Sequence, residues 1–285
     1  MLDRSAVSLE GKVAIVTGGG GGMGRSISET FAAYGAAVIV AEQHVGRAEE
    51  TVAAIEERGG RALAHVTDVR IQSQVDSMVA AGVRAFGRID VLVNLVGDYL
   101  GRGGAFARST EDDWEVLYDI NLKQVFRCTR AALPHMLEHG DGGSIINFST
   151  IEAFRGIPGA AVYSAFNTGL TGFTKSLALE LGPKKIRVNA IAPETTDTLQ
   201  IPVQRWIPEQ HRDRIPYWIP LGRFGQPDDA AGCALFLASD LSSWVTGTTV
   251  HMDGGALAAG GFYRAPDGRW TNTPIVTGGG LKLGG

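Results

Sequence analysis

Residues 13–24 read Val-Ala-Ile-Val-Thr-Gly-Gly-Gly-Gly-Gly-Met-Gly, a short apolar run that passes directly into a glycine run. The apolar part is mostly β-branched and predicts a buried strand. An amphipathic helical pattern follows from Met23 to Tyr34. Glycines between a strand and a helix let the backbone turn tightly and approach a phosphate, while the helix N-terminus offers free N–H groups and a favourable dipole. The stretch therefore predicts a pyrophosphate site at the first strand-to-helix turn.

The glycine run fits more than one spacing pattern. Gly19, Gly21 and Gly24 fit G-x-G-x-x-G, whereas Gly18, Gly22 and Gly24 fit T-G-x-x-x-G-x-G. A flexible loop is the alternative interpretation, but a strand before the glycines and a helix after them favour the phosphate site. The residues predicted to bind the cofactor here are Gly18, Gly22, Met23 and Gly24.

Outward from this stretch, short apolar runs alternate with longer helical patterns. Strands without a polar face are typical of a parallel sheet that helices cover on both sides. Right-handed crossovers then give a doubly wound, Rossmann-type αβα fold, with its ligand crevice at the carboxyl ends of the strands. We predict strands at 13–17, 37–41, 62–66, 89–95, 144–148, 187–191 and 248–252. We predict helices at 23–34, 45–58, 73–86, 111–137, 161–181 and 228–238. No linker separates these elements, so residues 1–285 are interpreted as a single domain.

Two stretches interrupt this alternation. Residues 195–220 contain four prolines and the tryptophans Trp206 and Trp218, and a connection this long in a compact domain predicts a lid or binding loop. Residues 254–285 are rich in glycine but include three aromatic residues. This tail either frays or packs on the rest of the molecule, and the sequence leaves both alternatives open. Aromatic side chains from both stretches would line an apolar pocket if they closed over the crevice.

The composition excludes several function classes. Lys and Arg number 26 against 30 Asp and Glu, which argues against a nucleic-acid or anionic-membrane surface. The two cysteines form no C-x-x-C pair, which argues against a disulfide framework or a cysteine zinc site. His135 and His139 share a helix face but lack the H-E-x-x-H pattern, so they are predicted to be surface residues and no metal is expected. No apolar run of membrane-spanning length or signal-peptide character is visible, which predicts a cytoplasmic protein.

Glu42 ends the second predicted strand, beyond the glycine run. An acidic side chain at this place accepts hydrogen bonds from the adenosine ribose hydroxyls and repels a 2′-phosphate. No Lys or Arg lies within the glycine loop or directly after Glu42. These residues predict NAD(H) rather than NADP(H); a solvated charge after a strand is the alternative interpretation.

These features, with several later motifs in the same order, resemble the short-chain dehydrogenase/reductase family from Gly11 to Gly255. The motifs include Asp68-Val69, the run Ile-Asp-Val-Leu-Val-Asn-Leu-Val-Gly at 89–97, and the run Ile-Arg-Val-Asn-Ala-Ile-Ala-Pro at 186–193. The resemblance implies that Asn121, in Asp-Ile-Asn-Leu, holds a catalytic water. It also implies that the following residues contact the adenine or border the nicotinamide: Asp68, Val69, Asn94, Gly97, Tyr163, Asn167, Pro193, Thr196 and Thr198.

The family's Tyr-x-x-x-Lys motif corresponds here to Tyr163-Ser-Ala-Phe-Asn167, and Thr150 stands in place of its serine. The resemblance makes Tyr163 the acid/base and Thr150 the group that orients the substrate oxygen. Lysine would bind the nicotinamide ribose and lower the tyrosine pKa. Asn167 carries no charge, so at neutral pH Tyr163 is expected to be a poor base but a competent acid. Ser149 would face the opposite way on its strand.

Other residues also depart from the family pattern. Leu95-Val96 replaces the usual Asn-Ala and makes the cofactor wall more apolar, and Glu194 stands where glycine usually follows Pro193. Glu152 is interpreted as a polar loop residue, with a substitute base as the alternative. Lys123 and Lys175 are interpreted as solvated helix charges rather than replacements for the missing ammonium.

The sequence therefore favours an NAD(H)-dependent oxidoreductase that interconverts a secondary alcohol or ring diol and a ketone. A small apolar or cyclic substrate is expected, with no nucleic-acid or membrane partner. The resemblance implies a homo-oligomer, either a dimer or a tetramer. The alternative is a repurposed member of the fold that catalyses elimination, isomerisation or cyclisation, or that binds a dinucleotide with little turnover, because Asn167 replaces the lysine.

Overall fold

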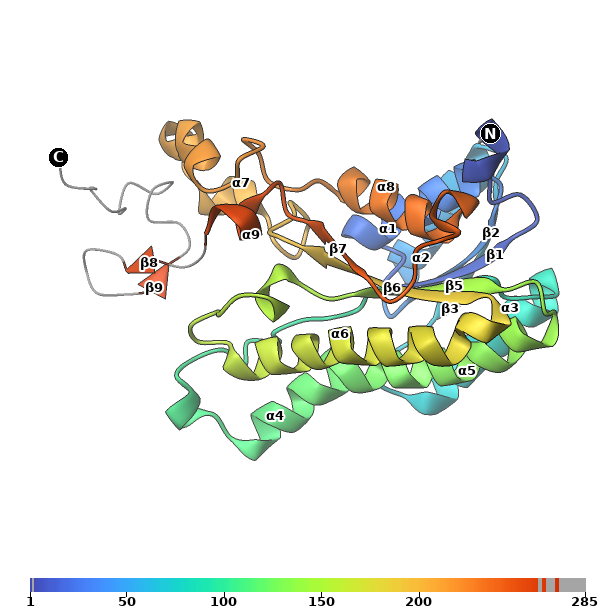
Figure 1. Cartoon of the computed structure of the whole chain (residues 1–285), viewed down its shortest axis with the longest axis horizontal. Coiled ribbons are helices and arrows are strands. Elements are labelled where there is room, and N and C mark those ends of the chain that lie inside the picture. The colour runs from blue at the N-terminus through green and yellow to red at the C-terminus, as the bar shows by residue number, and fades with distance from the viewer. Residues whose placement is uncertain (2, 261–262, 265–269, 272–285) are drawn as a thin grey trace.

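A parallel sheet of seven strands forms the centre of the protein (Figure 1). The computed structural model describes residues 1, 3–260, 263–264 and 270–271. The strands are β1 Val13–Thr17, β2 Ala37–Glu42, β3 Arg61–Val66, β4 Val91–Asn94, β5 Gly143–Phe148, β6 Ile186–Pro193 and β7 Thr249–Met252. Their order is β3-β2-β1-β4-β5-β6-β7, so the winding direction reverses between β1 and β4. The predicted fold is confirmed, and the reversal places the ligand crevice at the carboxyl ends of these two strands.

Helices cover both faces of the sheet in two layers (Figure 1). One layer holds α1 Gly22–Ala33, α2 Val45–Glu57 and α8 Pro227–Ala238. The other holds α3 Gln72–Phe86, α5 Gln124–Glu138 and α6 Ala161–Leu181, with α4 Glu111–Tyr118 at the end of this layer. Each layer buries its apolar face on the sheet and so holds the strand ends in a fixed arrangement.

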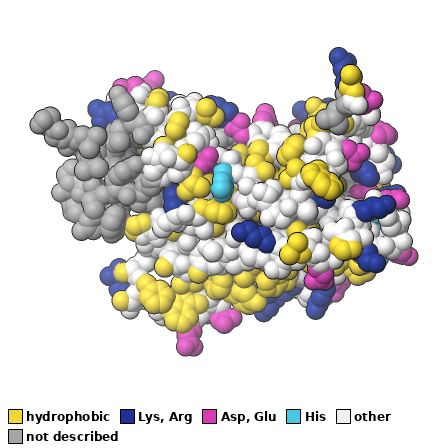
Figure 2. Space-filling view, in the orientation of Figure 1, with side chains coloured by type: hydrophobic (Ala, Val, Ile, Leu, Met, Phe, Trp, Pro, Cys, Tyr) yellow, Lys and Arg dark blue, Asp and Glu magenta, His cyan; other side chains and the backbone are white. Residues whose placement is uncertain are grey.

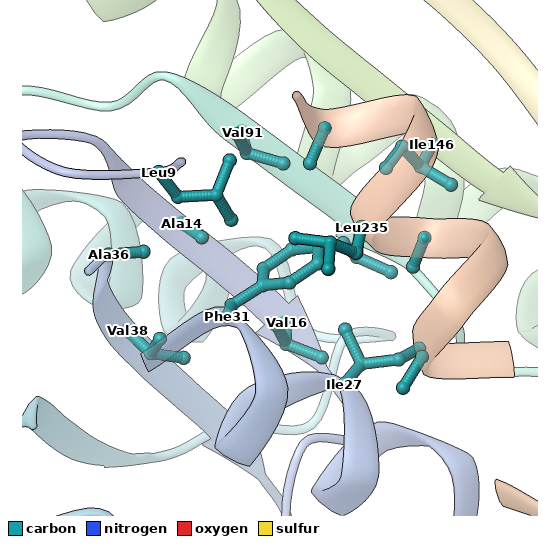
Figure 3. Close-up of a cluster of buried hydrophobic side chains, with 14 of the residues drawn as sticks. Leu9, Ala14, Val16, Ile27, Phe31, Ala36, Val38, Val91, Ile146 and Leu235 are labelled. Carbon is teal, nitrogen blue, oxygen red and sulfur yellow. The ribbon is translucent and has the colours of Figure 1, made fainter. Parts of the chain in front are cut away.

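The core between the sheet and the first helix layer shows why the opening stretch of sequence folds as it does. Ile27 and Phe31 of α1 are fully buried against Val16 and Val38 of the sheet, with Leu235 of α8 beside them (Figure 3). Burying a side chain of this size contributes about 1.5–3 kcal/mol. The glycine loop is therefore held between two rigid elements, which fixes its position at the crevice.

The helix predicted over 111–137 is not continuous. A π-helical turn, Asp119–Lys123, separates α4 from α5. Within it the Asn121 side-chain Nδ2 donates to the Leu117 carbonyl at 3.0 Å, an acceptor that an α-helix would use for a backbone N–H. Such turns are frequent at functional sites. The prediction of one helix was wrong because helical periodicity does not reveal a single inserted residue.

Residues 195–220, the lid, fold into short helical turns that include α7 Val203–Trp206. A separate apolar cluster joins the lid to the sheet, in which Ile207, Trp218 and Ile219 pack with Ile151 and Ala192. Ile151 lies just after β5 and Ala192 lies in β6, so the lid is anchored to the carboxyl edge of the sheet. It therefore lies on the side where the crevice opens.

The stretch 254–285 is described only in part. It contains α9 Ala256–Ala259 and a two-stranded antiparallel pair, β8 Tyr263–Arg264 and β9 Trp270–Thr271. The side chains of the predicted pocket-lining aromatics in this stretch, and that of Trp206, lie outside the part of the structure that is described. Within the part of the chain that is described, no helix combines the length and apolar content needed to cross a bilayer.

Candidate active site

A cavity of about 330 Å³ opens at the crevice between β1 and β4. Its walls come from the glycine loop, the ends of β2 and β3, the segment after β4, and the start of the lid. The cavity brings together these predicted cofactor residues: Gly18, Gly22, Met23, Glu42, Asp68, Val69, Gly97 and Thr198. Leu95 and Val96 also line it, so the wall beside them is apolar as expected.

The glycine loop forms a cradle that side chains would fill. A Cβ on Gly24 would collide with the Gly18 carbonyl oxygen, and a Cβ on Gly20 would lie 2.7 Å from the Glu42 Cγ. Gly18 itself has φ +69°, a left-handed conformation that favours glycine. The N-cap residue Gly21 offers no side-chain hydrogen bond to the first turn of α1. The free N–H groups and the open cradle fit a diphosphate.

The end of the cavity at Glu42 and Asp68 carries both signs of charge. Glu42 is 7% exposed, and its Oε1 accepts the His44 backbone N–H at 3.1 Å. Arg47 and Arg70 line the same end of the cavity. The Arg70 hydrogen bond to Asp68 lowers the pKa of that carboxyl. Neither arginine was predicted from the sequence. Arg47 reaches the cavity from the first turn of α2 and Arg70 from the turn after β3, so both lie outside the glycine loop and the position directly after Glu42.

Three other predicted cofactor residues are buried and do not line the cavity. Asn94 is fully buried, and its Nδ2 donates to the Asn147 Oδ1 at 2.9 Å, joining β4 to β5. Thr196 is 4% exposed, and its hydroxyl donates to the Glu194 carbonyl at 3.1 Å. Both residues fix the strand ends that border the cavity. Pro193 likewise ends β6 without lining the cavity.

Tyr163 lies in the first turn of α6, with Thr150 near it at the end of β5. The rings of Tyr163 and Tyr99 stack with centroids 4.0 Å apart and planes 25° apart. Burial raises the pKa of Tyr163 to about 12, and the charges of Glu152 and Asp98 raise it as well. Hydrogen bonding with Thr150 and Tyr99 acts in the opposite direction and lowers it. The sequence reasoning did not identify Tyr99.

Asn167 lies one turn after Tyr163 and is 4% exposed. Its Nδ2 donates to the Tyr163 carbonyl at 3.0 Å, so the side chain turns back on its own helix. Ser149 also contacts this helix, because its hydroxyl donates to the Asn167 carbonyl at 3.2 Å. Lys123 lies 4.0 Å from Asp119, and Lys175 is exposed on α6. Neither lysine is among the charges that shift the pKa of Tyr163.

Asn121, in the π-helical turn, holds the segment after β4. Its Oδ1 accepts the Asp98 N–H at 3.1 Å, and its Nδ2 donates to the Asp98 carbonyl at 2.9 Å. This pair of bonds fixes the backbone next to Tyr99. The water-holding role implied by the resemblance stays a prediction, and the bonds that the structure shows position the wall of the site.

Glu152, interpreted from the sequence as a polar loop residue, lies in a short helical turn between β5 and α6. It belongs to a buried group, the Arg155 cluster, which consists of Glu152, Arg155 and Glu194. Their side chains are 8%, 8% and 5% exposed. The Arg155 Nη2 donates to Glu152 at 2.9 Å and to Glu194 at 2.6 Å. The sequence did not indicate this burial, because a buried ion pair depends on contacts between distant segments, which a single loop does not reveal.

A second cavity, of about 310 Å³, reaches Tyr163 from the side of α4. Its walls include the segment 101–109, which contains Gly101, Gly103 and Gly104, and residues 159–163. The Gly104 N–H donates to the Gly159 carbonyl at 2.7 Å, which ties the two walls together. Tyr163 is therefore reached from a direction separate from the glycine cradle.

Comparison with known proteins assigns this arrangement to a family. The family model described as enoyl-(acyl carrier protein) reductase matches residues 19–256. The 3-oxoacyl-[acyl-carrier-protein] reductase FabG of Thermotoga maritima is 39% identical over 249 residues, covering 87% of this chain and 99% of the relative. The chain belongs to the short-chain dehydrogenase/reductase family. Its homologues are oxidoreductases, and an enzyme of this class is the resulting assignment.

Two further relatives of this short-chain dehydrogenase/reductase act on steroids by name. The 3beta-hydroxysteroid dehydrogenase 1 of Eggerthella lenta is 38% identical over 255 residues, covering 89% of this chain and 97% of the relative. A solved structure, a 7 alpha-hydroxysteroid dehydrogenase complexed with NADH and 7-oxo glycochenodeoxycholic acid, has a TM-score of 0.83 and 30% identity. It covers 90% of this chain and 98% of its own.

Metal ligation is not apparent in the parts of the chain with described positions, where no group of three or more His, Cys, Asp or Glu side chains could hold an ion. His139, predicted to be a surface residue, is instead 14% exposed. Its Nε2 lies 3.0 Å from the Ile89 carbonyl oxygen. The prediction for His139 was wrong because the helix end packs on the amino edge of the sheet.

Proposed function

We propose that this protein is an NAD(H)-dependent oxidoreductase that interconverts a secondary alcohol or ring diol with the corresponding ketone. The observation that carries the proposal is Tyr163, whose ring stacks on Tyr99, together with a glycine cradle that fits a diphosphate and whose cavity is lined by the neighbours of Tyr99, Asp98 and Leu100. Family membership supports the same reaction class.

The residues of the cavity between β1 and β4 would hold the dinucleotide. The glycine cradle would bind the pyrophosphate, Asp68 and Val69 would contact the adenine, and Glu42 would accept the ribose hydroxyls. Thr198 would border the nicotinamide end. When bound, the nicotinamide supplies a hydride in reduction or accepts one in oxidation.

The protein's own groups handle the proton. The Thr150 hydroxyl would orient the substrate oxygen, and Tyr163 would donate a proton to that oxygen in ketone reduction. With its pKa raised to about 12, Tyr163 stays protonated at neutral pH and is ready to act as an acid. Asn167 carries no charge and bonds its own helix, so it does not oppose this state.

Glu42 supports NAD(H) over NADP(H), while Arg47 at the same end of the cavity is the group that could attract a 2′-phosphate. We expect NADH to bind more tightly than NADPH when nicotinamide fluorescence is followed during titration. Glu42→Ala should narrow this preference by about tenfold or more, because it removes both a hydrogen-bond acceptor and a repulsive charge. The exposed Glu50→Ala on α2 serves as the control. Equal or tighter NADPH binding by the unaltered protein would refute the NAD(H) assignment.

A small apolar or cyclic substrate fits the surroundings of Tyr163. The Tyr99 ring stacks on Tyr163, and Ile151, which directly follows Thr150, packs with Trp218 in the apolar cluster of the lid. The hydroxysteroid dehydrogenases among the relatives support a cyclic substrate. A panel of cyclic and acyclic ketones tested with NADH would distinguish these classes, and exclusive turnover of acyclic ketones would contradict the proposal.

One observation favours a second candidate, a non-redox reaction such as elimination, isomerisation or cyclisation. The charges that shift the pKa of Tyr163 are negative, and Asn167 turns back on its helix. A protein that binds NADH yet turns over no alcohol or ketone would support this candidate.

We also propose that the protein is a dimer or tetramer. Hydrophobic side chains gather on the lower face of the molecule in Figure 2, over α4 and α6 of Figure 1. Leu179 of α6 is 81% exposed and would gain from burial. Light scattering on the purified protein measures the assembly, and a monomer would refute it.

A further inference from the structure

The Arg155 cluster joins two segments that are far apart in the sequence. Arg155 holds Glu152 with two bonds, Nη2 to Oε1 at 2.9 Å and Nε to Oε2 at 3.2 Å. Its Nη2 also donates to the Glu194 Oε2 at 2.6 Å. The other oxygen of Glu194 accepts the Thr195 N–H at 2.7 Å and the Thr195 hydroxyl at 2.9 Å. The carboxylate of Glu194 is thus fixed through both of its oxygens.

One of these segments carries the proton-transfer side of the site. The Thr150 Oγ1 accepts the Glu152 N–H at 3.3 Å, and the Ser164 hydroxyl donates to the Glu152 carbonyl at 2.7 Å. Ser164 directly follows Tyr163 on α6. The position of Glu152 therefore sets the position of both Thr150 and the first turn of α6.

The other segment carries the predicted nicotinamide side. Glu194 directly follows β6, and its N–H donates to the Met252 carbonyl of β7 at 3.1 Å. Its own carbonyl accepts the Thr196 hydroxyl at 3.1 Å. Through Glu194, Arg155 links the first segment to the start of the lid, where Thr196 and Thr198 lie.

The cluster has two carboxylates and one guanidinium, so with both acids ionised it carries one surplus negative charge. Burial raises the pKa of Glu152, and Arg155 acts against this by favouring the ionised form. The surplus charge lies close enough to influence the phenols, since Glu152 raises the pKa of both Tyr163 and Tyr99.

We propose that Arg155 is a positioning residue which holds the proton-transfer segment against the nicotinamide segment, and that the surplus negative charge of its cluster makes the site select neutral ketones over ketones bearing a carboxylate. The inference rests on the proposed oxidoreductase function and names its substrate class. A buried ion cluster is seldom more stabilising than apolar side chains of equal volume. What the cluster adds is a fixed position of one segment relative to the other and a charge close to the reacting groups.

The positioning role is tested by Arg155→Met, with Arg88→Met as the matched control. Arg88 also bonds two carboxylates, Asp90 and Asp141, but near the amino ends of β4 and β5. We expect kcat for ketone reduction to fall about 100-fold in Arg155→Met, because small misplacements of reacting groups have effects of this size. The KM for NADH should change far less. Arg155→Lys should recover part of kcat, and Arg88→Met should leave kcat unchanged.

A neutral triple variant covers the case in which Arg155→Met does not fold. Glu152→Gln/Arg155→Met/Glu194→Gln buries no charge and keeps similar side-chain volumes. We expect it to fold, as followed by circular dichroism and thermal melting, and to keep the low kcat, because the directional bonds are gone. A triple variant with the kcat of the unaltered protein would overturn the positioning role.

The charge selectivity is tested with one pair of substrates, a cyclohexanone bearing a ring carboxylate and its methyl ester. The unaltered protein should prefer the ester, and Glu152→Gln should reduce the ester-to-carboxylate ratio of kcat/KM by about tenfold. An unchanged ratio in Glu152→Gln would overturn the selectivity while leaving the oxidoreductase proposal intact. Failure of the unaltered protein to reduce any ketone with NADH would instead refute the proposed function, and this inference with it.

Discussion

An arginine joins two carboxylates at each edge of the central sheet. At the carboxyl edge, Arg155 bonds Glu152 and Glu194, and all three side chains are less than a tenth exposed. At the amino edge, Arg88 bonds Asp90 and Asp141, and here Asp141 is 61% exposed. These two arginines therefore make the same chemical pairing, Arg155 deep in the protein and Arg88 nearer its surface.

The groups around each arginine differ in a way that separates structure from function. Asp90 accepts the Val13 N–H at 2.9 Å and has Lys12 and His139 within about 4 Å, so its charge is balanced and it fixes the starts of β1 and β4. Within the Arg155 cluster, the charge of Glu152 raises the pKa of Tyr163. On the role proposed for this cluster, its charge would contribute to the chemistry because Tyr163 lies close to it.

The largest expected effect at the carboxyl edge comes from Tyr163→Phe. Removing the hydroxyl removes the proton donor, and kcat for ketone reduction should fall by about 10²–10⁴-fold. NADH affinity should change little, because the Tyr163 ring remains. Tyr34→Phe, at an exposed position after α1, is the matched control. Full activity in Tyr163→Phe would remove Tyr163 from the mechanism and leave the carboxyl edge without its assigned acid.

The pH dependence is the next largest effect. The pKa of Tyr163 is raised to about 12, so the phenol form predominates throughout the neutral range. Ketone reduction requires the phenol, and its kcat/KM should be flat from about pH 6 to 9. Alcohol oxidation requires the phenolate. At pH values below the pKa of Tyr163, the phenolate fraction rises about tenfold for each unit by which the pH is increased. Initial rates in both directions test this, and a plateau of oxidation near neutral pH would show that another group is the base.

Asn167→Lys should add a positive charge beside Tyr163, where the charges that shift its pKa are negative. An ammonium one helical turn away favours the phenolate, and lowering the Tyr163 pKa by one unit would raise alcohol oxidation at neutral pH by about tenfold. Ala165→Lys places the same charge on an exposed part of the same helix and serves as the control. Loss of a native non-redox activity in Asn167→Lys, with no gain in oxidation, would favour the repurposed alternative.

The fold could be predicted because each element carries its own signal. Most strands are short apolar runs rich in β-branched residues, the long helices are amphipathic stretches, and the alternation of the two favours a parallel sheet. The glycine loop was predicted for a similar reason, since its residues are contiguous and Gly24 admits no side chain. Even so, the π-helical turn around Asn121 escaped prediction, because one extra residue hardly changes the helical period.

The reaction centre could be predicted only where a family motif gave it. Tyr163 and Thr150 follow from such motifs, whereas Tyr99, Arg155 and Glu194 gain their significance from contacts across the fold. Arg155 bonds a carboxylate 39 residues away, and no local pattern indicates that partner. The sequence shows which residues are charged, but whether a charge is solvated or buried is decided by tertiary packing.

Arg88→Met should have the smallest effect on activity, and it completes the comparison between the two edges. Asp90 would lose its closest cation while remaining 2% exposed, so the free energy of unfolding should fall by about 1–3 kcal/mol. The bond from the Val13 N–H and the nearby Lys12 limit this loss. Urea denaturation measures the change in stability, and NADH-dependent ketone reduction measures activity, which should stay at the level of the unaltered protein. A loss of activity comparable to that of Arg155→Met would mean that the amino edge also sets the geometry of the reaction centre, and that burial and surplus charge do not distinguish the two clusters.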